Sequence, residues 1–334
     1  MSRVLLCARG RALELPLVIG ALRKRHVDPI VVDPAVFPTG TVLTLGYGGR
    51  EFRGDWGGEV GPLAEVSAVW QSIVVGLELP KMAPGMRETC VAASELAVVG
   101  LLDSLQVFQL DPFWNKARAD NKPYQLRLAQ QIGLEIPETV ISNDPEAVRA
   151  FARRAGPVVT KMLVQPLATE PRLDGESAPV FTTALTDADL AQLDGLDLCP
   201  MIFQAQVANQ LDVRVTIVGN RVFSAALDAE ARGGGDPDWR RQSYALDRAP
   251  AWAPYELPLP VADQLIRLLD HFGLNYGAVD LIVRPDGRHV FLELNASGSF
   301  AFLGDDQAIS IAAAIADVLV DPGARRTPAR GGHG

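Results

Sequence analysis

Short apolar runs alternate with a helical stretch at the beginning of the chain. Residues 4–8, 30–32 and 66–70 are apolar runs of strand length, and a stretch of helical character separates the first two. A strand–helix–strand order is typical of α/β domains. The first part of the chain is therefore predicted to form an α/β lobe.

Helix signals dominate the next part of the chain. Residues 88–105 have helical periodicity interrupted only by Gly100, and residues 121–132 form a second predicted helix that Gly133 ends. Residues 143–146 combine a cap residue with proline in the first turn, which predicts a further helix. The other elements predicted here are an extended segment at 137–143, a strand at 158–163, a mobile loop at 165–179 and a capped helix at 186–193.

Two β-hairpins are predicted in the second half of the chain. The first joins residues 213–218 to 222–227 through Gly219-Asn220, and the second joins 278–284 to 289–295 through Asp286-Gly287. Both dipeptides are strong signals for two-residue turns. The remaining predicted elements are a loop at Gly233–Gly235, helices at 261–272 and 307–319, and a disordered tail from Arg325 onward.

The second hairpin brings two carboxylates together. If the turn has two residues, counting back along both strands places Asp280 opposite Glu293, and Asn295 faces the same side as Glu293. Opposed like charges destabilise a sheet, and a hard divalent cation such as Mg²⁺ resolves the repulsion through oxygen ligands. Two alternatives stay open at this point: the carboxylates face water at a sheet edge, or a lysine or arginine neutralises them.

Two cations stand in apolar strands. Lys161 lies in the predicted strand at 158–163, and Arg214 alternates with valines in the first hairpin. A buried cation without an anionic partner is costly, so each needs one. For Arg214 the partner is either a substrate anion or Asp212, two residues away on the same face.

Composition narrows the function classes. The 334 residues carry a formal net charge of −9, which argues against a general nucleic-acid binder, and they suffice for two or three subdomains. The three cysteines are far apart and form no disulfide or zinc pattern. The apolar run at 308–316 is too short to cross a bilayer. A cytoplasmic protein that binds neither nucleic acid nor membrane is expected.

Four segments resemble ATP-grasp enzymes. DLIVRPDGRHVFLELNASG, at 280–298, is similar to that family's metal-binding hairpin, and NKPYQLRLAQQIGLEIPET (121–139) and VVTKML (158–163) are similar to its two ATP-lysine segments. FQAQVANQLDVRVTIVGNRVFSAAL, at 203–227, resembles the interdomain hinge and the Asp-x-Arg strand. Their matching order makes the joint signal strong. The resemblance implies a mixed α/β ATP-grasp fold with an N-terminal α/β lobe (1–117), a central small domain (118–206), a C-terminal antiparallel-sheet domain (207–322) and a disordered tail (323–334).

The N-terminal part points to a subfamily. VVDPAVFPTG, SAVWQS, LLDSLQ and DPFWNKARADNK resemble the graspetide, or microviridin-type, peptide maturases. Two departures stand out: the hinge reads Gln204-Ala205 where the family commonly has Gln-Glu, and Gln71 and Ser72 follow Trp70 where the subfamily often has two arginines.

The resemblance assigns roles to particular residues. It implies Mg²⁺ on Asp280, Glu293 and Asn295, and ATP phosphates on Lys122 and Lys161. It also implies catalytic roles for Arg214 and Lys161. The nucleotide would further contact the hinge and Arg214, through Gln204, Ala205, Val207 and Arg214. Apart from the resemblance, residues 238–241 form a basic loop with an aromatic residue, and two readings stay open: Arg240 and Arg241, with Asp212, bind an acidic substrate, or the loop is simply solvated.

The implied activity is peptide maturation. With ATP and Mg²⁺, such an enzyme activates Asp or Glu side chains of a ribosomal precursor peptide, which has a leader and an acidic core, and closes macrocyclic esters with Thr or Ser, or amides with Lys. An alternative is a ligase of the glutathione-synthetase or ribosomal-protein-modifying kind, which joins free amino acids or adds them to a peptide or protein. A nonenzymatic nucleotide-binding protein is a third possibility. The presence of all three implied metal ligands, Asp280, Glu293 and Asn295, argues against it. A homodimer is also expected.

Overall fold

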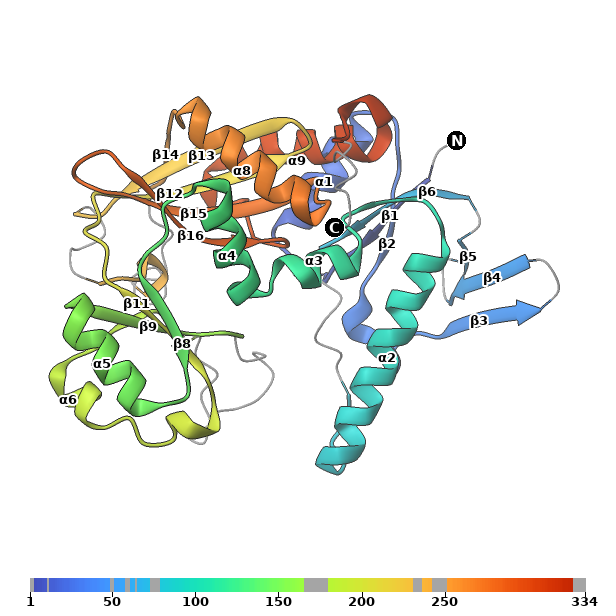
Figure 1. Ribbon diagram of the computed structural model, residues 1–334. Coiled ribbons are helices and arrows are strands. Elements are labelled where there is room, and N and C mark those ends of the chain that lie inside the picture. The colour runs from blue at the N-terminus through green and yellow to red at the C-terminus, as the bar shows by residue number, and fades with distance from the viewer. Residues whose placement is uncertain are drawn as a thin grey trace.

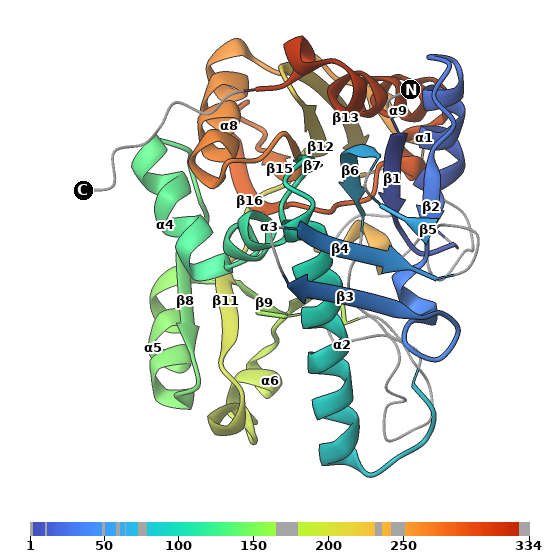
Figure 2. The ribbon, with the colours of Figure 1, turned by 90° about the vertical axis from the view of Figure 1, so that its right-hand side faces the viewer.

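The computed structural model has three parts (Figure 1). The N-terminal lobe and the C-terminal sheet lie side by side, and a smaller central unit projects from the C-terminal sheet. Figure 2, like Figure 1, shows the long helix α2 (Pro84–Ser104) extending downward from the N-terminal lobe. The structure describes residues 3–10, 12–48, 51–57, 61–63, 65–72, 79–164, 180–230, 236–241 and 251–326.

The N-terminal lobe is an α/β unit, as predicted. Its parallel sheet has the order β2-β1-β6-β7, and its inward-facing apolar side chains explain the short apolar runs of the sequence. A three-stranded antiparallel sheet, β3-β4-β5, is attached to it. The elements are β1 (Arg3–Cys7), α1 (Glu14–Arg23), β2 (Ile30–Val32), η1 (Pro34–Val36), β3 (Leu43–Gly48), β4 (Glu51–Trp56), β5 (Gly61–Pro62), β6 (Val66–Gln71), α2 (Pro84–Ser104) and β7 (Phe108–Leu110).

Two helices connect this lobe to the rest of the chain. They are α3 (Phe113–Ala119) and α4 (Lys122–Ile132). The Asn121 side chain caps α4 by accepting a hydrogen bond from the Tyr124 amide at 3.1 Å, and Gly133 ends the helix in the left-handed conformation. The cap therefore fixes Lys122 at the first position of α4.

The central unit is a four-stranded antiparallel sheet, β10-β9-β11-β8, covered by α5 on one face. Asp144 caps α5, and Thr186 with Asp189 forms the capping box predicted for α6. Its elements are β8 (Thr139–Ser142), α5 (Pro145–Ala155), β9 (Val158–Met162), β10 (Thr183–Ala184), α6 (Asp187–Ala191), η2 (Leu196–Leu198) and β11 (Met201–Ala205). The predicted loops at 165–179 and Gly233–Gly235 lie outside the described residues.

The C-terminal unit is a five-stranded antiparallel sheet, β14-β13-β12-β15-β16, and α4 and α8 pack on one face of it. The two-residue turn Gly219-Asn220 is confirmed, because Val218 pairs with Arg221. Its elements are β12 (Leu211–Val218), β13 (Arg221–Asp228), β14 (Ala253–Pro254), α8 (Leu259–Phe272), β15 (Tyr276–Val283) and β16 (His289–Asn295).

The turn of the second hairpin differs from the prediction. The backbone amide of Arg284 donates to the carbonyl of Arg288 at 2.9 Å, so the connection has three residues, 285–287, in place of the predicted two. Gly287 has a φ of +82°, the left-handed conformation that a three-residue hairpin turn requires. Near the turn, the strand register is therefore one residue away from the predicted one.

A β-bulge corrects the register before the polar end of the hairpin. Leu281 pairs with Phe291, and the next residue back, Asp280, pairs with Glu293. Leu292 is the extra residue on β16. The predicted pairing of Asp280 with Glu293 is therefore confirmed, although the turn length from which it was counted was wrong.

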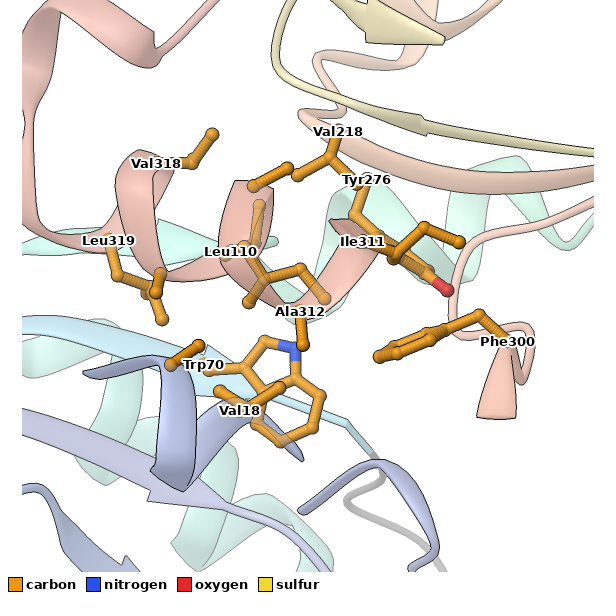
Figure 3. Packing of buried hydrophobic residues seen from close by; sticks show 14 of the residues in the cluster. Val18, Trp70, Leu110, Val218, Tyr276, Phe300, Ile311, Ala312, Val318 and Leu319 are labelled. Carbon is orange, nitrogen blue, oxygen red and sulfur yellow. The ribbon is translucent and has the colours of Figure 1, made fainter. Parts of the chain in front are cut away.

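Helix α9 (Asp305–Val320), preceded by η3 (Ala301–Leu303), joins the N-terminal lobe to the C-terminal sheet. Figure 3 shows its side chains Ile311 and Ala312 between Trp70 of β6 and Tyr276 of β15. One apolar cluster thus contains residues from both units. The two units are therefore packed as a single body, which holds the N-terminal lobe next to the C-terminal sheet.

This shared core allows a first prediction. Ile311 is completely buried, so Ile311→Ala should reduce the free energy of unfolding by about 2–5 kcal/mol through lost burial and a new cavity. Ile309, on the same helix, is 47% exposed, and Ile309→Ala should change it by less than about 0.5 kcal/mol. Denaturant unfolding of both variants measures the difference. Equal losses would contradict the shared core.

The predicted disordered tail is wrong for residues 323–326, and residues 327–334 lie outside the described part of the chain. Residues Pro322–Ala324 form η4, and Arg326 is buried, with an ion pair to Asp270 at 2.7 Å. Asn275 and Arg326 also exchange hydrogen bonds. The Gly, Pro and Arg content of this segment predicted disorder, but partners from α8 and the loop after it hold Arg326 in place. Among the described helices, none has the length and hydrophobicity of a membrane span.

Candidate active site

Two adjoining pockets lie where the central sheet meets the C-terminal sheet. The first has a volume of about 590 Å³ and the second about 520 Å³. Lys161, Thr182 and Leu292 line both of them. We call them the hinge pocket and the hairpin pocket, after the segments Gln204–Asn209 and Asp280–Asn295 that line them.

The hinge pocket combines backbone groups with apolar side chains. Its lining includes the whole segment Gln204–Asn209, together with Val159, Ile282 and Leu292. The Gln204 side chain donates to the Thr139 hydroxyl at 3.0 Å, so it is engaged within the central sheet. A flat apolar ligand in this pocket would therefore meet the hinge backbone and aliphatic faces.

The hairpin pocket holds the predicted metal residues together. The Asn295 amide nitrogen donates to Asp280 Oδ2 at 3.2 Å and to Glu293 Oε1 at 3.0 Å. All three side chains come from the polar end of the second hairpin, which the bulge at Leu292 aligns. Two carboxylates and a carboxamide thus converge on one point of the pocket wall.

Both predicted ATP lysines lie at this point. Glu293 Oε2 is 3.1 Å from Lys122 Nζ and 3.3 Å from Lys161 Nζ, although the two lysines come from α4 and β9. Burial raises the pKa of Glu293, but Lys161 and Lys122 outweigh it and hold that pKa well below its usual range. Glu293 is therefore ionised, and it occupies the place between the lysines that a phosphate oxygen could take.

Arg214 pairs across the sheet rather than along its own strand. β12 places Arg214 opposite Asp280, and their side chains form an ion pair at 2.8 Å. Asp212, the alternative partner considered from the sequence, accepts a hydrogen bond from Asn209 at 2.9 Å. Burial raises the pKa of Asp280, and Arg214 opposes this effect. Arg214 therefore contacts the predicted metal residues directly, whereas Asp212 lines the same pocket and is bound to Asn209.

An aromatic wall faces the charged cluster. Trp239, Trp252 and Phe302 form a mutual cluster with ring centroids 5.0–5.6 Å apart, and the Arg214 guanidinium lies 5.3 Å from the Phe302 centroid. Trp239 and Trp252 line the hairpin pocket. The pocket thus has one polar wall and one aromatic wall, which suits a substrate with both charged and apolar atoms.

The two arginines of the predicted basic loop have different positions. Arg240 lines the hairpin pocket and pairs with the buried Asp238 at 2.6 Å. That hydrogen bond, with added contributions from Glu293 and Asp280, raises the pKa of Arg240. Arg241 instead binds the Thr182 carbonyl at 3.2 Å and stacks on Phe181. Arg240 therefore lines the hairpin pocket, whereas Arg241 contacts residues 181–183 beside it.

The residues present fit a Mg²⁺ ion. Among the described residues, no group of three His, Cys, Asp or Glu side chains is close enough to hold a metal. The hairpin offers two carboxylates and one amide oxygen, and Mg²⁺ commonly takes one or two carboxylates and completes its shell with water and phosphate oxygens. Three cations, on Lys122, Lys161 and Arg214, surround the two carboxylates, and this surplus suits a polyphosphate.

Two family models match consecutive parts of the chain. Residues 119–319 match the RimK-like ATP-grasp domain, and residues 12–117 match the MvdD pre-ATP grasp domain. The chain belongs to the RimK-like ATP-grasp family. The predicted mixed α/β ATP-grasp fold is thereby confirmed, and so is the resemblance of the N-terminal part to microviridin-type proteins. No match was found among curated proteins.

Solved structures of similar proteins extend this result. Macrocyclase MdnC from Microcystis aeruginosa, solved with the precursor peptide MdnA, is 37% identical, with 96% of this chain and 99% of that chain covered and a TM-score of 0.83. Macrocyclase MdnB of the same organism is 30% identical over 96% and 100%, with a TM-score of 0.79. A RiPP-associated ATP-grasp ligase of Chryseobacterium gregarium, solved with ADP, leader and core peptide, is 26% identical over 96% and 97%, with a TM-score of 0.85.

Several pocket residues were not found from the sequence. Asp120 lines the hairpin pocket and accepts a hydrogen bond from the Ala296 amide at 3.4 Å, and Trp252 forms part of the aromatic wall. Phe302 also belongs to that wall, from the segment after the second hairpin. Asp120 directly precedes the capped start of α4, which was a usable signal. Nothing in the local pattern brings Trp252 and Phe302 together, because they are 50 positions apart.

Proposed function

We propose that this protein is an ATP-dependent peptide macrocyclase, which joins Asp or Glu side chains of a ribosomal precursor peptide to Thr or Ser hydroxyls, or to a Lys amine. The observation that carries the proposal is the likeness to MdnC over 96% of the chain, with the N-terminal lobe included. The match to the MvdD pre-ATP grasp domain covers that lobe specifically. A general RimK-type ligase is less well supported, because the RimK-like match covers only residues 119–319.

The two adjoining pockets suit one orientation of the bound nucleotide. The adenine would lie against the apolar faces and backbone of the hinge pocket, near Ala205 and Val207. The phosphates would extend past Lys161 toward Lys122 in the hairpin pocket and replace Glu293 as the lysines' anionic partner. Asp280, Glu293 and Asn295 would hold Mg²⁺, which supplies charge neutralisation for phosphoryl transfer when bound.

The substrate carboxylate would lie between Arg214 and Arg240. Both guanidiniums line the hairpin pocket, and the aromatic wall beside them excludes water from an activated carboxyl group. A carboxylate oxygen attacks the γ-phosphorus of ATP, the bond from that phosphorus to the β-phosphate oxygen breaks, and ADP leaves. Arg214 and Lys161 offset the negative charge of the acyl phosphate that forms.

The second step closes the ring. A hydroxyl oxygen or an amine nitrogen attacks the acyl carbon, and the carbon–oxygen bond to phosphate breaks. Phosphate leaves, and the proton of the nucleophile passes to the phosphate or to solvent. Activation is needed because a hydroxyl is a weak nucleophile toward a free carboxylate. Each ring therefore uses one ATP and removes one water from the peptide. The predicted homodimer and cytoplasmic location remain parts of the proposal.

Mass spectrometry of a treated precursor tests this function. A short peptide encoded beside the protein, with a leader and a core rich in Thr and Asp or Glu, should lose one water per ring, with one ADP released each time. Mild alkaline hydrolysis should restore the water of an ester and leave an amide intact. A gain in mass by an added amino acid would refute the macrocyclase and favour the free amino-acid ligase.

A further inference from the structure

A short loop after the metal hairpin contacts both the hairpin pocket and the N-terminal lobe. Residues 297–302 follow the metal hairpin, and Ser297 and Gly298 line the hairpin pocket. The loop lies tightly on β15: a Cβ added at Gly298 would be 2.5 Å from the Ala278 side chain. The buried Tyr276 hydroxyl also donates to the Gly298 carbonyl. The path of this loop, which we call the 297–302 loop, is therefore closely constrained.

The inner side of the loop holds Arg214. The Ser299 carbonyl accepts a hydrogen bond from Arg214 Nη2 at 3.4 Å, and the Phe302 ring lies under the guanidinium at 5.3 Å. Asp280 is the third partner, on Nη1. If Asp280 becomes engaged with Mg²⁺ and nucleotide, the loop contacts remain to orient Arg214. The orientation of the Arg214 guanidinium then depends on the position of the 297–302 loop.

The outer side of the loop is held by Glu14 of the N-terminal lobe. Glu14 Oε1 accepts hydrogen bonds from the Ser299 hydroxyl and, at 3.5 Å, from the Ala301 amide, across a separation of 285 residues or more. Glu14 is the first residue of α1, which packs along α9 in the shared core. The loop before α1 is itself tied down, since the Gly10 amide donates to Asp33 at 2.8 Å. The position of Glu14 is thus set by the N-terminal lobe.

We propose that Glu14 is a positioning residue for ring closure: by holding Ser299 and Ala301, it fixes the 297–302 loop and thereby the orientation of Arg214. The inference rests on the proposed function. It gives the N-terminal lobe a role in the chemical step, because the lobe supports the residue that is proposed to contact the reacting carboxylate. A small displacement of such a group lowers the rate of the chemical step more than it weakens the binding of nucleotide.

Steady-state kinetics with the precursor test the inference. Glu14→Ala should lower kcat for ring formation about tenfold, with KM for ATP changed less than about twofold. Glu14→Gln keeps an acceptor oxygen at the same place and should retain kcat to within about threefold of the wild type. Ser299 is exposed, and Ser299→Ala should also lower kcat. The double variant Glu14→Ala/Ser299→Ala should be no slower than Glu14→Ala alone, because the two substitutions remove the same contact.

Arg25→Ala is the matched control. Arg25 also links the two units, through Asp317 at 2.7 Å and the Ala313 carbonyl at 2.9 Å, but away from the pocket. This variant should lower the melting temperature and leave kcat near the wild-type value. An unchanged kcat in Glu14→Ala, additive effects in the double variant, or an equal kcat loss in Arg25→Ala would each overturn the inference while leaving the macrocyclase intact. Absence of rings from the wild type would overturn both.

Discussion

Glu293→Gln is expected to lower the rate of ATP-dependent ligation by about 10³-fold while the fold is kept. The carboxylate belongs to the proposed Mg²⁺ set and contacts Lys122 and Lys161, so its charge organises the place where phosphate charge must be neutralised. Glutamine has nearly the same shape, so the change removes the charge and turns one acceptor oxygen into an amide donor without opening a cavity. Asn295→Ala, which removes the bridging amide, should also abolish most turnover.

The measurement is ADP release that depends on the precursor, together with the melting temperature of each variant without nucleotide. The matched control is Asp286→Asn in the turn of the same hairpin, where Asp286 pairs with Arg288 at 2.9 Å. That exposed ion pair should contribute little, and ligation should stay near the wild-type rate. Near-normal ligation by Glu293→Gln would show that the hairpin is not the metal site.

Arg214→Lys is expected to lower the ligation rate by about 10²-fold, although the positive charge is kept. Arg214 uses three features that lysine lacks together: one nitrogen on Asp280, a second on the Ser299 carbonyl, and a planar face on Phe302. An ammonium cannot keep all three contacts and also reach the substrate carboxylate. KM for ATP should change little, because the hinge and the two lysines stay in place.

Arg221→Lys provides the matched control for Arg214→Lys. Arg221 stands on the neighbouring strand β13, with its guanidinium 5.1 Å from the Phe223 centroid and 3.3 Å from Asp317, so it makes the same kinds of contact on the surface. Its replacement should leave the ligation rate near that of the wild type. Steady-state kinetics on both variants decide the matter, and equal small effects would argue against a role for Arg214 in the chemical step.

Local signals predicted the elements that depend on neighbouring residues. The capped start of α4 at Asn121, the capping box at Thr186 and the Gly219-Asn220 turn all formed as expected, because each uses contacts within a few positions. The second hairpin shows the limit of this reasoning. A three-residue turn and the bulge at Leu292 shifted the register in opposite directions, and only the backbone shows both shifts.

The sequence by itself determined the ATP-grasp class, the presence of the second hairpin and the two lysine segments, because these are carried by motif order and strand alternation. The pairing of Asp280 with Glu293 also needed the bulge at Leu292, which the sequence did not predict. The tertiary structure decided which charges meet. Only the arrangement of separate helices and strands places both lysines on Glu293, pairs Arg214 with Asp280 and brings Glu14 to Ser299. Such contacts join residues from separate elements, and no periodicity or cap within one element can specify them.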